Sequence, residues 1–237
     1  HPLPVQQAAL PAASPTPQPS ATPAPQFPQS RPIDQKLPVK VRSARLRYEQ
    51  SRKLTVFYGG VTVTHDTSTL LARELRSADQ GANAEASGGV LVRDAQRQFT
   101  AEAGRLRYGN ALQEGILDDG VHMVTVGPYG RPVTITGQSG GYQGLSRSAW
   151  VDGSVWVHRD GLSVSAQRAE IEDGGAELRL LRQVDVRLDS NHAQADAAEL
   201  RRDGQSLELS GSVRARFVPA ALKQAAAQPW RNHCTTK

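Results

Sequence analysis

The chain of 237 residues has a single cysteine, Cys234, and no apolar run of 18 or more residues. One cysteine cannot form an internal disulfide, so no disulfide framework is available to hold the fold. Without a long apolar run, no segment is suited to cross a bilayer as a helix. Helical periodicity is nearly absent as well, and the one helix-friendly stretch, 219–228, lies close to the C-terminus. These absences favour an all-β chain without internal cross-links.

Motifs for cofactors and nucleic acids are also missing. The formal net charge is +5, but the arginines are spread along the chain, and no zinc spacing, recognition helix or aromatic RNA-binding motif accompanies them. There is no phosphate loop and no dinucleotide fingerprint. Several histidines lack the close pairing of a metal site, and three of them are expected at exposed turn tips, namely His65, His158 and His192. We therefore expect no nucleic acid, no metal and no cofactor.

The N-terminal segment differs in composition from the rest of the chain. Residues 1–31 are rich in Pro, Ala, Gln and Ser and carry almost no charge, and prolines at this density exclude a helix or a central strand. We expect residues 1–38 to be a disordered leader, either an extended tether or a plain tail. The first residues, HPLPV, fit a mature exported protein whose signal was removed, or a truncated chain. A short tail is expected over 219–237.

An internal repeat is the strongest signal in the remaining sequence. Six valines recur at intervals of 29, 31, 34, 29 and 29 residues: Val61, Val90, Val121, Val155, Val184 and Val213. An alanine follows four of them after eleven residues (Ala72, Ala101, Ala166, Ala195), and a large aliphatic follows three of them after sixteen (Leu106, Ile171, Leu200). A fixed period of this length indicates one small unit stacked repeatedly into an elongated array.

Each unit contains two alternating segments separated by turn residues, which predicts about eleven or twelve strands. An aspartate lies five residues after three of the valines, at Asp66, Asp160 and Asp189, and Asp160-Gly161 is a strong hairpin signal. The third unit departs from this pattern. Its Gly- and Ser-rich insertion, 127–148, contains a short expected strand, 133–136, and predicts a long loop or bulge between Ile135 and Trp150.

Residues 43–76 resemble the repeat of the OstA-like (LptA–LptC) periplasmic family of lipopolysaccharide transport. The family pattern of aliphatic-x-Tyr, an aliphatic strand, Gly-x-Val and Ala-x-x-aliphatic is matched by Leu46, Tyr48, Leu54, Val56, Gly60, Val61, Val63, Ala72 and Leu75. Similar sequence extends to about Phe217. The resemblance implies an elongated, taco-like open β-jellyroll over 39–218, with an apolar interior that holds acyl chains. It also implies a periplasmic or cell-envelope location.

On this interpretation the protein binds lipopolysaccharide or a related amphiphilic lipid and transfers it along an envelope bridge without catalysis. The expected lipid contacts are Val61, Val63, Val90, Val92, Leu106, Val121, Met123, Val155, Val157, Ile171, Val184, Val186, Leu200 and Val213. Arginines expected at the rim, where they would meet phosphates or carboxylates, are Arg45, Arg47, Arg105 and Arg107. Expected partners are like-folded transport proteins that pair through edge strands, and other copies of this chain. The candidate edges are the N-terminal segment 39–48 and the last expected strand, 207–217.

Two other functions stay open on the sequence. Inward Val, Leu and Ile are usually ordinary core, so the chain also fits a structural envelope scaffold with a filled core and a protein partner. The segment 137–141 fits the G-x-S-x-G form of a hydrolase elbow, with Ser139 as the nucleophile. That elbow needs a helix after the serine, and the following residues, GYQGLSRS, do not predict one.

Overall fold

The computed structural model describes residues 37–78, 83–126, 130–144, 146–172, 177–200 and 206–218. Apart from Leu37 and Pro38, the expected leader lies outside the described residues. So do the expected tail and Cys234. Among the described residues, no helix has the length and apolar character needed to cross a membrane.

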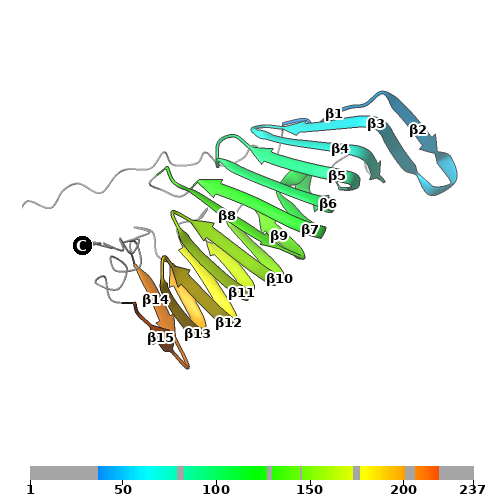
Figure 1. Ribbon diagram of the computed structural model, residues 1–237. Coiled ribbons are helices and arrows are strands. Elements are labelled where there is room, and N and C mark those ends of the chain that lie inside the picture. Colours follow the sequence, from blue (N-terminus) through cyan, green and yellow to red (C-terminus); the bar gives the residue numbers. More distant parts are fainter. Residues whose placement is uncertain are drawn as a thin grey trace, which may run out of the picture.

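The chain folds as an elongated, open-ended β-jellyroll made from one antiparallel sheet (Figure 1). Its strands are β1 (Lys40–Arg42), β2 (Arg45–Glu49), β3 (Leu54–His65), β4 (Ser68–Ser77), β5 (Ala84–Asp94), β6 (Phe99–Gly109), β7 (Glu114–Val126), β8 (Pro132–Gly137), β9 (Ser139–Gln143), β10 (Ser148–Arg159), β11 (Leu162–Glu172), β12 (Glu177–Leu188), β13 (Asn191–Leu200), β14 (Leu207–Ser210) and β15 (Arg214–Arg216). Two short 3-10 turns, η1 (Gln50–Arg52) and η2 (Asn110–Leu112), precede β3 and β7. The predicted all-β class is confirmed.

Each long strand bends at its middle, and the bends form one column along the array. In five alternate strands, two consecutive residues at the bend have positive φ: Gly59-Gly60, Gly88-Gly89, Asp119-Gly120, Gly153-Ser154 and Arg182-Gln183. The pairing register shifts at each of these pairs, so that on β3 two residues oppose the single Arg73 of β4. This is the arrangement of a β-bulge, which bends a strand sharply. One of the repeated valines follows each pair, so the repeat of the sequence is the repeat of the bend.

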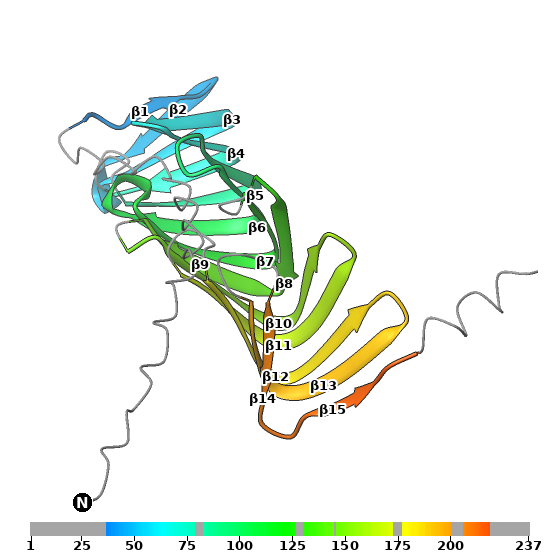
Figure 2. The same ribbon diagram turned by 90° about the vertical axis from the view of Figure 1, so that its left-hand side faces the viewer.

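The bends fold the sheet into two facing walls, which Figure 2 shows most clearly for β10 to β13. Wall 1 is formed by the strand halves that carry Val61, Val90 and Val121. Wall 2 is formed by the other halves, which carry Leu75 and Leu106. Inward residues alternate with outward polar ones along both walls, and the inward residues make one continuous apolar core. We call the side opposite the bends, where turns of the two walls approach each other, the mouth.

The spacing of valine and alanine is explained by hairpin register. Val61 pairs with Ala72, Val155 with Ala166 and Val184 with Ala195. The expected turn at Asp160-Gly161 is present between β10 and β11, and both residues have positive φ, at 46° and 82°. The eleven-residue spacing therefore measures the distance around one turn of wall 1.

Two strand predictions were wrong. A strand was expected over 133–136 and is present as β8, but the long loop or bulge expected between Ile135 and Trp150 is instead largely strand. Strands β8 and β9 together act as one bent strand between β7 and β10. Its glycines provide room: a side chain at Gly141 would collide with the indole of Trp150. The last strand was expected over 207–217, but it is split into β14 and β15, with Gly211 at φ 88° between them.

The two ends of the array leave apolar residues uncovered. At the N-terminal end, Leu46 and Tyr48 of β2 are each 58% exposed, although they pair with β3 in the register of the inner face. At the C-terminal end, Phe217 is 74% exposed. Within the described part of the chain, β2 pairs only with β3 and β14 only with β13, so both are edge strands, as the sequence suggested for these two segments.

Candidate functional site

The interior between the walls contains nearly all residues expected to contact a lipid. Thirteen of the fourteen belong to the buried core, and ten of these lie on wall 1. Val213 does not belong with them, because it is 46% exposed and lies between β14 and β15. The sequence repeat broke down there, since the last unit has no long strand to carry its valine.

Most of wall 2 was missed by the sequence analysis. Its buried residues include Leu75, Leu117, Val151, Leu178 and Leu180. They lie on the far side of each bend from the repeated valines. On the strands with the two-residue bulge, the inward residues keep the same alternation on both sides of the bend, because Leu117 lies four residues before Val121 and Val151 lies four residues before Val155. The signal available was therefore an aliphatic residue four positions before a repeated valine.

The interior is filled by side chains in this conformation. Gly140 of wall 2 has no side chain, and a Cβ placed there would lie 3.1 Å from Met123 Cε and 3.4 Å from Val121 Cγ1 of wall 1. One interior cavity has a volume of about 60 Å³, and a second one has about 10 Å³. The larger has room for about four water-sized groups. An acyl chain of a dozen carbons therefore requires the walls to move apart.

Backbone pairing does not oppose such a movement. Every strand pairing among the described residues joins neighbours along one wall or across a bend. No strand of wall 1 pairs with wall 2 at the mouth, in this part of the chain. The walls are held together there by side-chain contacts, so they can separate without breaking the ladder hydrogen bonds that are costly to lose.

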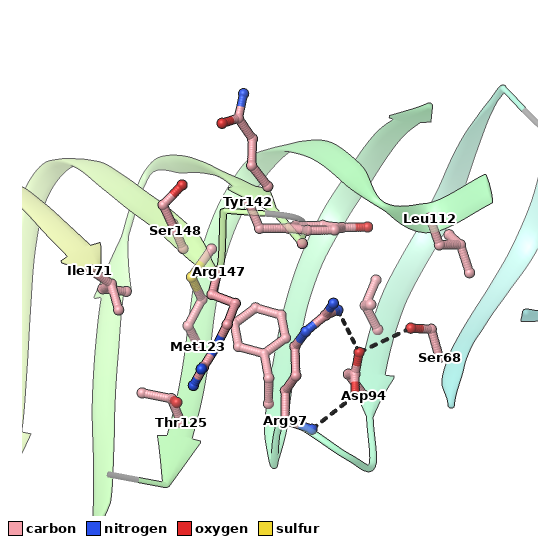
Figure 3. A pocket seen from close by; sticks show the side chains of 15 residues that line it. Ser68, Asp94, Arg97, Leu112, Met123, Thr125, Tyr142, Arg147, Ser148 and Ile171 are labelled. Carbon is pink, nitrogen blue, oxygen red and sulfur yellow. Dashed lines mark hydrogen bonds and ion pairs between the residues drawn. The ribbon is translucent and has the colours of Figure 1, made fainter. Parts of the chain in front are cut away.

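The larger cavity lies at the mouth and has a charged pair at one side (Figure 3). Asp94, at the end of β5, is 5% exposed. Its carboxylate accepts bonds from Ser68 Oγ at 3.1 Å, Thr67 Oγ1 at 3.2 Å and the Arg97 backbone N–H at 3.0 Å. Arg97 Nη1 donates a further bond at 2.8 Å. The buried charge of Asp94 is thus both paired and hydrogen-bonded, as a buried carboxylate requires.

Wall 2 supplies uncharged polar groups to the same region. The ring of Tyr142 lies over Gly115, where a Cβ would be 2.5 Å from the ring, and Figure 3 shows this ring beside the cavity. Burial raises the pKa of the Tyr142 hydroxyl above its ordinary value of 10.0. Gln113 follows η2 and is 2% exposed. None of these mouth residues was identified from the sequence, because turns far apart in the chain bring them together.

The arginines expected at the rim lie elsewhere. Arg105 and Arg107 alternate with the buried Leu106, so they point to the outer face of wall 2. There Arg105 lies 3.3 Å from Asp119 and Arg107 lies 3.3 Å from Asp118. Arg45 and Arg47 are exposed on the edge strand β2. The four arginines form no cluster at the mouth. Arg105 and Arg107 instead form ion pairs with acidic residues on the solvent-facing side of the sheet.

The structure corrects one further expectation, at His65, and agrees with another, at Ser139. His65 was expected at an exposed turn tip, but it is the last residue of β3, points inward and is 1% exposed.

Ser139 begins β9 and pairs with Asp152 on β10. A strand follows the serine where a nucleophile elbow needs a helix, so turn and packing chemistry explain the G-x-S-x-G match. No group of three or more His, Cys, Asp or Glu within the described residues could hold a metal ion.

Comparison with known proteins adds little beyond this description. The sequence matches no protein-family model, and no curated protein is found as a relative. Among solved structures, the chain is similar to LptH from Pseudomonas aeruginosa, described as the LptA-homologous periplasmic component of the lipopolysaccharide transport device. The identity is 11%, the TM-score is 0.31, and the alignment covers 79% of this chain and 100% of LptH. At these values the assignment of fold rests on the strand pairing of the chain itself.

Proposed function

We propose that the protein binds the acyl chains of lipopolysaccharide or a related amphiphilic envelope lipid between its two walls and passes the lipid on without chemical change. The observation that carries this proposal is a continuous apolar interior whose walls, as far as the structure describes them, are joined at the bends and not by strand pairing at the mouth. The sequence motif shared with the OstA-like repeat supports the choice of lipid and a periplasmic location.

The energetics of loading are favourable in outline. Each buried methylene contributes about 0.8 kcal/mol, so a chain of a dozen methylenes contributes about 10 kcal/mol before ordering costs. Parting the walls exposes Val, Leu and Ile, but the incoming chain covers the same surface again. The net cost of opening is therefore the loss of close wall-to-wall packing, which the lipid replaces with contacts of the same chemical kind.

Partners follow from the ends of the array. Among the described residues, β2 pairs with β3 alone and β14 with β13 alone, and Leu46, Tyr48 and Phe217 are exposed beside or near them. We propose that like-folded transport proteins, or other copies of this chain, add their strands there and extend the apolar interior from one protein to the next.

A photo-reactive amino acid tests the lipid proposal directly. Placed at Val121, which is 3% exposed and faces the interior, it is expected to cross-link to lipid in cells. Placed at the neighbouring His122, whose side chain is 45% exposed on the outer face, it is expected to give no lipid adduct. Equal labelling at both positions, or none at either, would reject the proposal.

The filled interior favours one other candidate. With cavities of about 60 and 10 Å³, the walls already pack as an ordinary core, which suits a structural scaffold of the cell envelope. The same experiment separates the two functions. A scaffold would give cross-links from Val121 to neighbouring parts of its own chain and none to lipid.

A further inference from the structure

Polar atoms without hydrogen-bond partners lie beside the cavity at the mouth. Among the described residues, both side-chain polar atoms of Gln113 and the hydroxyl of Tyr142 are buried and unpaired. Gln113 is 2% exposed, so solvent does not satisfy its amide. An unpaired buried polar group is costly, and native structures keep few of them. Gln113 directly precedes β7, and Tyr142 lies on β9, which pairs with β7, so two such groups on one wall indicate a missing partner.

Their surroundings place that partner in the cavity. Tyr142 lines the cavity directly, together with the apolar side chains of Val92, Met123 and Ile171. Gly144 also lines the cavity, and Gln113 lies directly behind it: a Cβ at Gly144 would lie 3.0 Å from Gln113 Oε1 and 3.1 Å from Arg97 Nη1. A side chain at this position would collide with both polar atoms, so only glycine lets the Gln113 amide lie this close to the cavity wall. The backbone N–H of Gly144 donates to the Gln113 carbonyl at 2.6 Å, which fixes the two residues together.

The charges at the mouth determine what this partner can be. Asp94 is already balanced by Arg97 at 2.8 Å, so another charged group would be buried without an ion-pair partner. The amide of Gln113 offers two donors and an acceptor, and the phenol of Tyr142 offers one donor and an acceptor. A neutral group that both donates and accepts fits them. A cavity of about 60 Å³ limits that group to a few atoms.

We propose that this cavity binds a neutral hydroxyl group carried on an acyl chain, with the Gln113 amide and the Tyr142 hydroxyl as its hydrogen-bond partners. This inference rests on the proposed lipid-binding function, because the chain that carries the hydroxyl lies between the parted walls. It goes further by giving the interior a preference among chains: a chain with a hydroxyl satisfies two buried groups that a plain chain leaves unpaired.

The test compares two ligands of equal length and charge, octadecanoic acid and 12-hydroxyoctadecanoic acid, by competition against a fluorescent fatty acid on the full chain. Satisfying buried polar groups is expected to make the hydroxylated acid bind about tenfold more tightly. In the double variant Gln113→Met with Tyr142→Phe, this ratio is expected to fall to about one. Tyr58→Phe is the matched control, because the outward-facing Tyr58 undergoes the same chemical change on β3 and the ratio should persist.

Each outcome decides the proposal. If neither acid binds, the proposed function fails and the hydroxyl site fails with it. If both bind equally to the unaltered protein, only the hydroxyl site is rejected, and Gln113 and Tyr142 serve buried water. If the preference survives the substitutions, these residues are not its source. Circular dichroism checks that the double variant folds, and if it does not, Tyr142→Phe alone must reduce the ratio.

Discussion

The bends of the strands allow a quantitative prediction about glycine and backbone conformation. Gly89 has φ 85°, and a Cβ placed there meets nothing within 4 Å. Gly89→Ala therefore tests backbone strain alone, and we expect a loss of about 1–2 kcal/mol in the free energy of unfolding. Its neighbour Gly88 has φ 83°, and a Cβ there would lie 2.8 Å from Arg73 Cβ. Gly88→Ala should lose about 1–3 kcal/mol more, because a steric collision adds to the strain.

The same geometry predicts a gain at the equivalent bend of β12. Gln183 has φ 54° without being glycine. Gln183→Gly relieves the strain but increases the entropy of the unfolded chain, so we expect a net gain of about 0.5–1 kcal/mol. Urea unfolding followed by circular dichroism measures the free energy of unfolding of all three variants. The slope of this free energy against urea concentration should be the same in each variant and in the unaltered protein, as expected for two-state unfolding.

Ser87→Ala, on β5 just before the bend, is the control for these measurements and should change stability by less than about 0.5 kcal/mol. If Gly89→Ala were as mild as Ser87→Ala, the left-handed corner would not be present in solution. The two-wall architecture derived from it would then be wrong.

Three further predictions concern the interior and the mouth. Met123→Arg places a charge at a position that is 1% exposed, so it should cost at least about 3 kcal/mol and abolish lipid loading, whereas the outward His122→Arg should do neither in calorimetry and lipid extraction. Burial raises the pKa of Tyr142 in the folded protein, so the unfolded chain loses its phenolic proton at lower pH than the folded chain does. The free energy of unfolding should therefore fall as the pH rises above about 10. Thermal melts of Tyr142→Phe should lack this loss of stability at alkaline pH. Asp94→Ala leaves Arg97, whose side chain is 18% exposed, without its partner at 2.8 Å and should cost about 3 kcal/mol. An unchanged urea midpoint would show that the pair is not formed.

The hairpins of the fold can be predicted from the sequence more clearly than the bends in the strands. Alternating residues and the spacing from Val61 to Ala72 predict the pairing of β3 with β4, because strand register is local and periodic. The bend depends on consecutive residues with positive φ. Glycine pairs mark it on β3 and β5, but on β12 the pair is Arg182 and Gln183, which no propensity would select. Local preference is overridden there by pairing with strands that already bend.

The mouth could not be predicted for a different reason. Asp94, Gln113 and Tyr142 belong to three separate turns or strand ends and meet only when the two walls face each other. The Gly-rich insertion was predicted as a loop or bulge because glycine is typical of turns, but glycine is equally typical of positions where a neighbouring side chain packs against the backbone. In the structure Met123 packs against Gly140 and the indole of Trp150 packs against Gly141. This packing can be recognised only once the neighbouring strands are in place.

Separation of the walls is the movement on which lipid binding depends, and the distance between the turns at the mouth reports it most directly. Gln96 on wall 1 and Ser146 on wall 2 are both exposed, so cysteines there can carry spin labels after Cys234→Ser removes the native thiol. Pulsed electron paramagnetic resonance should show the distance between these labels increasing when an acylated lipid is added. A distance that stays the same while lipid is demonstrably bound would show that the lipid does not lie between the walls.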